Sequence, residues 1–285
     1  MSTVNAIASW FGTNRSLAHE VGKSLEGCNW VGVVFAGGMC EIPHITARTL
    51  MVNDLHKHLI NLSRVAADPV LGPKLYRRLR RHAFHPDALE GAQDYCRRVE
   101  AVSGESPERT MLFSDPYHVP DPLTWAECYF ISAWMSRHGS AGTKSEFDTG
   151  ISTRWNANGG DSAAHFHGAV RSLVGWRKTL RRANFTCLDF REFLKKCKDE
   201  PGIGVYVDPP FPGPGDGYKH AFADKDHRDL ANLLNGYSNS RIVARFYEHP
   251  MVRELYPEPG WTWRKLTGGK RQTNEAAPEV LLVRN

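Results

Sequence analysis

The sequence predicts an α/β fold: a mostly parallel sheet with an antiparallel edge strand, flanked by helices. Short continuous apolar runs, typical of buried strands, alternate with segments of helical periodicity. One such run, residues 204–207, ends at an acid and two prolines, which cannot continue a sheet ladder. The last two apolar runs, 261–266 and 279–283, are separated by a polar segment. They predict a terminal hairpin, which supplies the antiparallel strand.

Composition is that of an ordinary globular protein. The 285 residues are 41% apolar and 24% charged, which suits one large domain or a domain that carries an insertion. The first residues lack a secretory pattern, and no apolar run reaches the ~20 residues of a membrane helix. We therefore expect a soluble, cytoplasmic protein. The net charge of +5 permits a polyanionic partner without proving one.

Cysteine and histidine give no sign of a metal site. The six cysteines form no C-x-x-C pair, which indicates reduced thiols. His165 and His167 have no cysteine or carboxylate nearby at metal-ligand spacing. We expect no metal.

The first predicted strand, residues 30–35, leads into the glycine pair Gly37-Gly38. Glycines at the end of a first parallel strand let the backbone pass close to a ligand. The full G-x-G-x-x-G fingerprint is absent, so a nicotinamide enzyme is poorly supported. Upstream, Trp10 and Gly12 precede a predicted helix over 13–25, where they form either a ligand contact or a simple helix start.

The second predicted strand, residues 49–52, ends in Asn53-Asp54. An acid at this strand tip can hydrogen-bond both hydroxyls of a ribose. Asp54 can equally cap the next helix, predicted over 55–66, although Asn53 could take that role.

A basic, helix-like segment follows between Pro69 and Pro86 and contains no acid. Such a segment is usually a solvated face, but its local density in a mildly basic chain favours contact with phosphates. Helices are predicted over 88–102 and 123–137. The long polar stretch 138–167 is either a surface loop or a loop that contacts nucleic acid. The candidate contacts of the two segments are Lys74, Arg77, Arg78, Arg80, Arg81, Lys144, Arg154 and Asn156.

The second half of the chain again alternates helices and strands. Helices are predicted over 168–182, 191–198, 223–235 and 249–256, and strands over 185–188, 204–207 and 241–246. Asp189-Phe190 closes the first of these strands, and Asp208-Pro209-Pro210-Phe211 closes the second. In an open α/β sheet, these carboxyl ends are where ligands bind.

The order of these parts resembles the Dam-like family of DNA adenine-N6 methyltransferases, which carry a D-P-P-[YF] motif. The motif reads Asp208 to Phe211 here, and the residues that extend it are Tyr218, Phe222, Asp226, His227, Leu230 and Ala231. The similarity covers nearly the whole chain and is weakest over 63–167. Met39 stands where the family usually has a further glycine.

The resemblance implies a Rossmann-like methyltransferase sheet and S-adenosyl-L-methionine as the methyl donor. It implies a catalytic domain of residues 1–66 and 168–285, with a mainly helical and loop-rich target-recognition insert at 67–167. The implied cofactor-binding residues are Trp10, Gly12, Phe35, Ala36, Gly37, Gly38, Asp54, Asp189 and Phe190. The implied partner is double-stranded DNA, and we expect a monomer.

The resemblance also implies a mechanism for methylating an exocyclic amine, whose lone pair is delocalised into the ring. Asp208 and the Pro209 carbonyl would grip its two hydrogens, Pro210 would keep that carbonyl oriented, and Phe211 would stack on the base. The adenine would leave the duplex, and Tyr218 would help to enclose it. Cytosine-N4 methylation, an RNA substrate and a catalytically idle DNA-binding relative stay open as alternatives.

Overall fold

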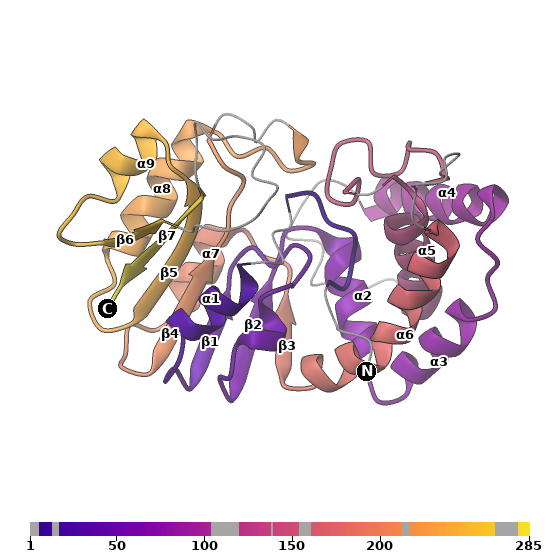
Figure 1. Cartoon of the computed structure of the whole chain (residues 1–285), viewed down its shortest axis with the longest axis horizontal. Helices are drawn as coiled ribbons and strands as arrows, with labels where there is room; N and C mark the ends of the chain where they lie inside the picture. Colours follow the sequence, from indigo (N-terminus) through magenta and orange to yellow (C-terminus); the bar gives the residue numbers. More distant parts are fainter. Residues whose placement is uncertain are drawn as a thin grey trace. The chain divides into compact units, whose positions relative to one another are not determined.

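Seven strands form one mixed sheet in the described part of the computed structural model, which covers residues 6–12, 17–103, 120–137, 139–153, 161–212, 217–265 and 279–285 (Figure 1). The strands are β1 (Trp30–Val33), β2 (Thr49–Asn53), β3 (Ala183–Thr186), β4 (Ile203–Val207), β5 (Arg241–Tyr247), β6 (Thr262–Lys265) and β7 (Glu279–Arg284). Their order is β3-β2-β1-β4-β5-β7-β6. Strands β1 to β5 are parallel, and β7 runs antiparallel to both β5 and β6. The predicted fold class is confirmed.

The strand predicted over 185–188 begins two residues earlier, at Ala183. It also ends earlier, because Leu188 bonds to a side chain instead of to the β2 backbone. The Leu188 N–H donates to Asn53 Oδ1 at 2.9 Å, and the Leu188 carbonyl accepts from Asn53 Nδ2 at 3.0 Å. The strand therefore stops where the Asn53 amide takes over its pairing.

Helices cover both faces of the sheet. The face with Val205 and Val207 packs in one core with α7 (Phe190–Lys196), α8 (Asp224–Asn235) and α9 (Pro250–Leu255). On the opposite face lie α1 (Ala18–Ser24) and the 3₁₀ turn η1 (Ile42–His44), which pack together. A side chain at Gly204 would come within 2.9 Å of Leu25 and Cys28, so α1 lies close against this face.

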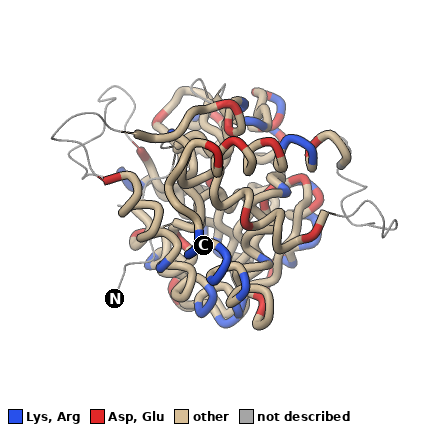
Figure 2. The backbone as a smooth tube through the Cα atoms, turned by 90° about the vertical axis from the view of Figure 1, so that its right-hand side faces the viewer, with Lys and Arg blue, Asp and Glu red and all other residues tan. Residues whose placement is uncertain are grey.

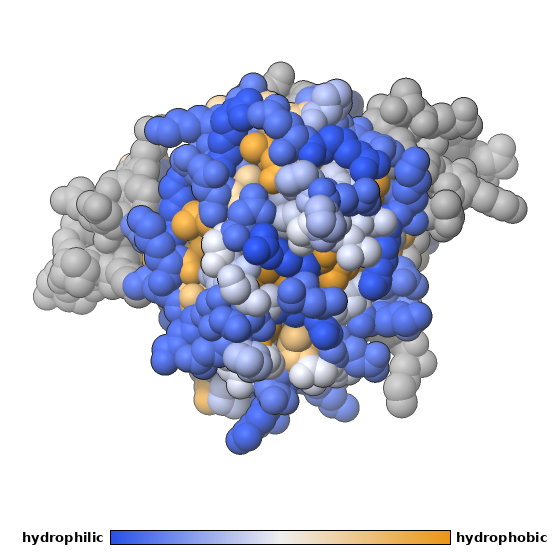
Figure 3. Space-filling model, turned by 90° about the vertical axis from the view of Figure 1, so that its left-hand side faces the viewer, coloured by the Kyte–Doolittle hydropathy of each residue, from blue (hydrophilic) through white to orange (hydrophobic). Residues whose placement is uncertain are grey.

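The outer strand β6 is an edge with a mainly polar surface. Thr262, Arg264 and Lys265 are exposed, and charge on an edge strand discourages pairing with another sheet. Figure 3, which faces the side where β6 and α9 lie in Figure 1, shows a mainly hydrophilic surface with small, separate apolar areas.

The described residues group into two compact units. The sheet unit comprises Asn14–Ala36, Cys40–Leu55 and Arg182–Asn285, and the helical unit comprises Met1–Thr13, Gly37–Met39 and His56–Arg181. These units are defined by compactness alone, so they do not test the predicted division into a catalytic domain and a target-recognition insert.

The helical unit contains α2 (Lys57–Ala67), α3 (Leu71–Leu79), α4 (Pro86–Ser103), α5 (Pro122–Met135) and α6 (Ser162–Leu180). Helix α2 packs against α3, α5 and α6, and α5 also packs against α4. Helix α5 has apolar residues all round because it is buried, with Trp125, Tyr129 and Phe130 each at most 5% exposed. The predicted loop 138–167 is wrong at its end, where the Asp161 carboxylate accepts from the Ala164 N–H at 2.9 Å and starts α6.

No helix among the described residues is long and apolar enough to cross a membrane. All six cysteines fall in the described part of the chain and are free thiols, as predicted.

Candidate active site

Four neighbouring parallel strands end beside residues that the sequence predicted to bind cofactor or substrate. Phe35 and Ala36 follow β1, Asp54 follows β2, Asp189 follows β3 and Asp208 follows β4. Parallel strands end at the same edge of a sheet, so these residues share one edge of the sheet unit. The strand order reverses between β1 and β4, which is where open α/β sheets bind ligands.

Asp208 is held by a buried arginine from the neighbouring strand. Arg245 lies on β5 and donates from Nη1 to Asp208 Oδ2 at 2.8 Å and from Nε to Glu279 Oε2 at 3.2 Å. The Arg245 and Glu279 side chains are 3% and 7% exposed, whereas that of Asp208 is 21% exposed. The network is therefore closed to water on the arginine side, while the Asp208 carboxylate can still meet a substrate.

A third carboxylate, Glu41, contributes to the field around Asp208. Glu41 is buried, and burial followed by the negative charge of Asp208 raises its pKa to about 7. The Asp208 pKa is also raised, first by burial, while Arg245 lowers it. Burial raises the pKa of the Tyr206 hydroxyl, and the negative charges of Asp208 and Glu41 add to the effect. The site thus has more buried acidic groups than cations, and Arg245 is the cation that opposes the rise of the Asp208 pKa.

Two aromatic residues of the predicted substrate set lie near this carboxylate. The Phe211 ring packs against Tyr247 with centroids 4.5 Å apart, and the Arg245 guanidinium lies 5.5 Å from its centroid. Burial raises the pKa of the Tyr218 phenol, and the charges of Asp208 and Asp54 add to the effect. The charges at the tips of β2 and β4 therefore both influence the Tyr218 phenol.

Asp54 does not cap the helix that follows it. Helix α2 begins at Lys57, and its cap is His56, whose Nδ1 accepts from the Leu59 N–H at 3.2 Å. Asn53 does not cap it either, since both side-chain atoms of Asn53 bond to the ends of β1 and β3. The helix-cap alternative for Asp54 is therefore wrong, and its half-buried carboxylate stays at the β2 tip.

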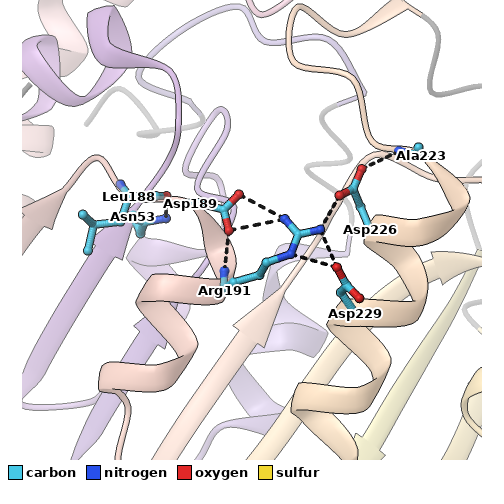
Figure 4. A network of polar contacts seen from close by, with 7 residues as sticks. All are labelled: Asn53, Leu188, Asp189, Arg191, Ala223, Asp226 and Asp229. Carbon is cyan, nitrogen blue, oxygen red and sulfur yellow. Dashed lines mark hydrogen bonds and ion pairs between the residues drawn. The ribbon is translucent and has the colours of Figure 1, made fainter. Parts of the chain in front are cut away.

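Asp189 belongs to a charged network that joins α7 to α8 (Figure 4). Its Oδ1 accepts from the Arg191 N–H at 2.8 Å and starts α7. Arg191 also pairs with Asp189 at 3.2 Å, with Asp229 at 2.8 Å and with Asp226. The Asp189 side chain is 36% exposed, and a carboxylate can accept about four hydrogen bonds. Asp189 therefore has a structural role and capacity for one further donor.

Phe190, the other residue predicted at the cofactor adenine, is only 6% exposed. Its ring lies 5.8 Å from Phe35 and 5.4 Å from Phe222, and these two rings lie 5.6 Å apart. Phe35 and Phe222 are half-buried, so they present the accessible part of this aromatic cluster.

The other residues of the cofactor prediction, Trp10, Gly12, Gly37 and Gly38, belong to the helical unit. The Trp10 indole lies between two glycines of positive φ. A Cβ at Gly37 would come within 3.0 Å of Trp10 Nε1, and one at Gly142 within 2.5 Å of Trp10 Cζ2. Glycine at position 37 is thus favoured by its positive φ and by the close Trp10 ring.

Met39 adopts a backbone conformation that is typical of glycine. Its φ is 60°, and its side chain is 1% exposed. A left-handed backbone disfavours a Cβ, so the burial of this side chain must offset the strain. The chain keeps the glycine-type geometry at the position where the family usually has glycine.

The predicted DNA contacts differ in accessibility. Lys74, Arg77, Arg80 and Arg81 are exposed, and so is Lys144. Arg78 instead faces α5, where Nη1 donates to Thr124 and to Glu127, each at 3.1 Å. Arg154 and Asn156 lie outside the described residues.

Sequence reasoning missed Arg245, Glu279 and Glu41. Arg245 carried a signal, a charge in the middle of the otherwise apolar strand Arg241–Tyr247. The other two carried none, because their partners lie far away in the sequence. Among the described residues, no three His, Cys, Asp or Glu side chains are grouped so that they could hold a metal.

No protein-family model matches the chain, and a comparison with curated proteins gives no match. The function must therefore be argued from the residues and their geometry.

Proposed function

We propose that the chain transfers a methyl group from S-adenosyl-L-methionine to the N6 amine of an adenine in duplex DNA. The observation that carries this proposal is the position of Asp208. Its carboxylate lies at the carboxyl end of β4, beside the point where the strand order reverses. Arg245 orients it at 2.8 Å, and two prolines follow it.

This arrangement suits attack by a weakly nucleophilic amine. An ionised carboxylate accepts a hydrogen bond from the amine and stabilises the positive charge that develops on nitrogen in the transition state. The Pro209 carbonyl is the second acceptor, and the pyrrolidine rings restrict its orientation. Phe211 supplies a face for stacking, and Tyr218 helps to enclose a base that has left the duplex.

The residues at the strand tips fit the proposed cofactor. Asp54 lies at the tip of β2 and does not cap α2, and its carboxylate is our candidate for the ribose hydroxyls. Phe35 and Ala36 line the end of β1, while Asp189 keeps capacity for an adenine amino group beside Phe190. The sulfonium of S-adenosyl-L-methionine supplies an activated methyl group. Trp10, Gly12, Gly37 and Gly38 stay part of the proposed cofactor set from the helical unit.

The test measures transfer of labelled methyl to unmethylated duplex DNA, followed by digestion to nucleosides and mass spectrometry. We expect N6-methyladenine from the native chain. Asp208→Asn keeps the size of the side chain but loses the negative charge, and we expect transfer to fall on the order of 10²–10³-fold. Asp87→Asn is the matched control, since the Asp87 side chain is 87% exposed and lies on α4.

Thermal melting and cofactor binding of Asp208→Asn must be measured beside transfer, so that unfolding is not mistaken for loss of chemistry. Near-normal transfer by a folded Asp208→Asn would contradict the mechanism. N4-methylcytosine as product would keep the mechanism and change the substrate. Cofactor binding without any DNA product would favour RNA, and no cofactor binding would favour an idle DNA-binding protein.

A further inference from the structure

A groove of about 260 Å³ lies between α3 and α6, within the helical unit. Helix α3 contributes Pro73 and Tyr76, α6 contributes Val174, Arg177 and Lys178, and the C-cap of α6 contributes Arg181. Val174 is 52% exposed, so the groove presents an apolar side chain to solvent. The groove therefore has an apolar floor and a basic side.

All three cations line the groove, and Arg181 lies beside the other two because it is four residues from Arg177 and three from Lys178. At the end of α3, the Arg80 guanidinium lies 5.6 Å from the ring centroid of Tyr76. Because Tyr76 lines the groove, Arg80 adds a further positive charge on the same side of α3. Figure 2 shows Lys and Arg gathered in the lower part of the view, the height at which α3 and the end of α6 lie in Figure 1.

Asp68 is an acid that interacts with Arg177, one of these cations. Asp68 accepts from the N–H groups of Val70 and Leu71, each at 2.7 Å, and these bonds lower its pKa, with smaller contributions from Arg177 and Lys74. Asp68 is thus engaged by the start of α3. Lys178, Arg181 and Arg80 form no ion pair with any described carboxylate, so the groove keeps a net positive charge.

We propose that this groove binds the sugar–phosphate backbone of duplex DNA. The choice of DNA rests on the proposed function, whereas the affinity for phosphates rests on the charge of the groove. Residues three apart on a helix are separated by a rise of about 4.5 Å, so their long side chains can reach two different phosphates of one DNA strand. Lys178 and Arg181 can therefore each meet a phosphate, while a deoxyribose lies against Val174. The surface extends the DNA contacts beyond α3 to residues of α6 that the sequence did not indicate.

The test compares two variants of the full chain that remove the same charge. Lys178→Gln with Arg181→Gln alters the groove, and Lys195→Gln with Lys196→Gln alters exposed lysines on α7 of the sheet unit. Binding of a fluorescent duplex is measured by anisotropy over a range of salt concentrations, without cofactor. The plot of log K against log salt has a negative slope, and two lost phosphate contacts should make it shallower by about 1.8. At ~0.1 M salt this corresponds to a loss of affinity of roughly 60-fold.

A second variant, Val174→Glu, places a negative charge on the floor at an exposed position and should weaken binding at least as much. An unchanged slope in the groove variant would overturn the proposal, as would an equal loss in the α7 control. A loss seen with duplex RNA but not with duplex DNA would also overturn it. Because no methyl transfer is measured, failure of the proposed chemistry alone would leave this binding result intact.

Discussion

Replacing Arg245 by methionine removes the only cation that contacts Asp208 and Glu279 among the described residues. Asp208 and Glu279 would then lose the Arg245 charge at a position that is shielded from water, since Arg245 is 2% exposed. Removal of one partner from a buried ion pair typically costs about 3–5 kcal/mol. At roughly 2–4 °C per kcal/mol for a chain of this size, we expect Tm to fall on the order of 10 °C.

The same change should alter the pH dependence of the proposed methyl transfer. Burial raises the Asp208 pKa and Arg245 lowers it, so without Arg245 the pKa rises further. Asp208 must be ionised to accept from the amine, and the acidic limb of the rate profile should therefore move to higher pH. Glu279→Gln should do the opposite, because the charge of Glu279 raises the Asp208 pKa.

The assay is single-turnover transfer across the acidic and neutral range, with thermal melting of each variant. Arg241→Met is the matched control, since Arg241 lies on the same strand and bonds to Asn285 Oδ1 and the Glu26 carbonyl rather than to a carboxylate. The double variant Arg245→Met with Glu279→Gln should regain part of the lost stability. Acidic limbs that move in the same direction for Arg245→Met and Glu279→Gln would refute the reasoning. So would a melting temperature for Arg245→Met that equals the control.

Two further expectations concern stability. The Glu41 pKa is raised from its ordinary value of 4.5 to about 7, so the folded chain holds a proton that the unfolded chain releases, and stability falls as pH rises between these values. Glu41→Gln should therefore be more stable than the native chain above pH 7, by roughly 3 kcal/mol, and the difference should vanish below pH 4.5. Denaturant unfolding at each pH measures the free energy of unfolding of both proteins. A difference that does not change with pH would contradict the raised Glu41 pKa. Gly142→Ala should lose about 3 kcal/mol, because φ is +80° and its Cβ would collide with Trp10. Gly91→Ala, in an open position on α4, is the control and should gain slightly, so equal melting temperatures would contradict the clash.

The sequence predicted the sheet well because its strands are buried and continuously apolar. The residue after each apolar run could therefore be placed at a strand tip, as for Asp54 and Asp208. Contacts formed by distant residues could not be predicted. Arg245 and Glu279 are 34 residues apart and belong to strands whose pairing becomes known only with the fold.

Helix boundaries in the polar middle of the chain were harder to predict for a different reason. Asp161 starts α6 through one side-chain bond, which a stretch rich in serine, threonine and asparagine does not distinguish from a turn. The cap of α2 was missed because histidine is an uncommon cap, while the more usual Asn53 is engaged by β1 and β3.

The Trp10 indole also constrains how this sequence can vary. Gly37 and Gly142 are far apart in the chain, yet the same ring lies beside both: a Cβ would collide with it at Gly142 and would be in tight contact with it at Gly37. A smaller residue at position 10 would remove the steric demand at both glycines at once, although positive φ would still favour glycine there. Substitutions at these three positions should consequently be interdependent, so that a change tolerated at one of them depends on the residue present at position 10.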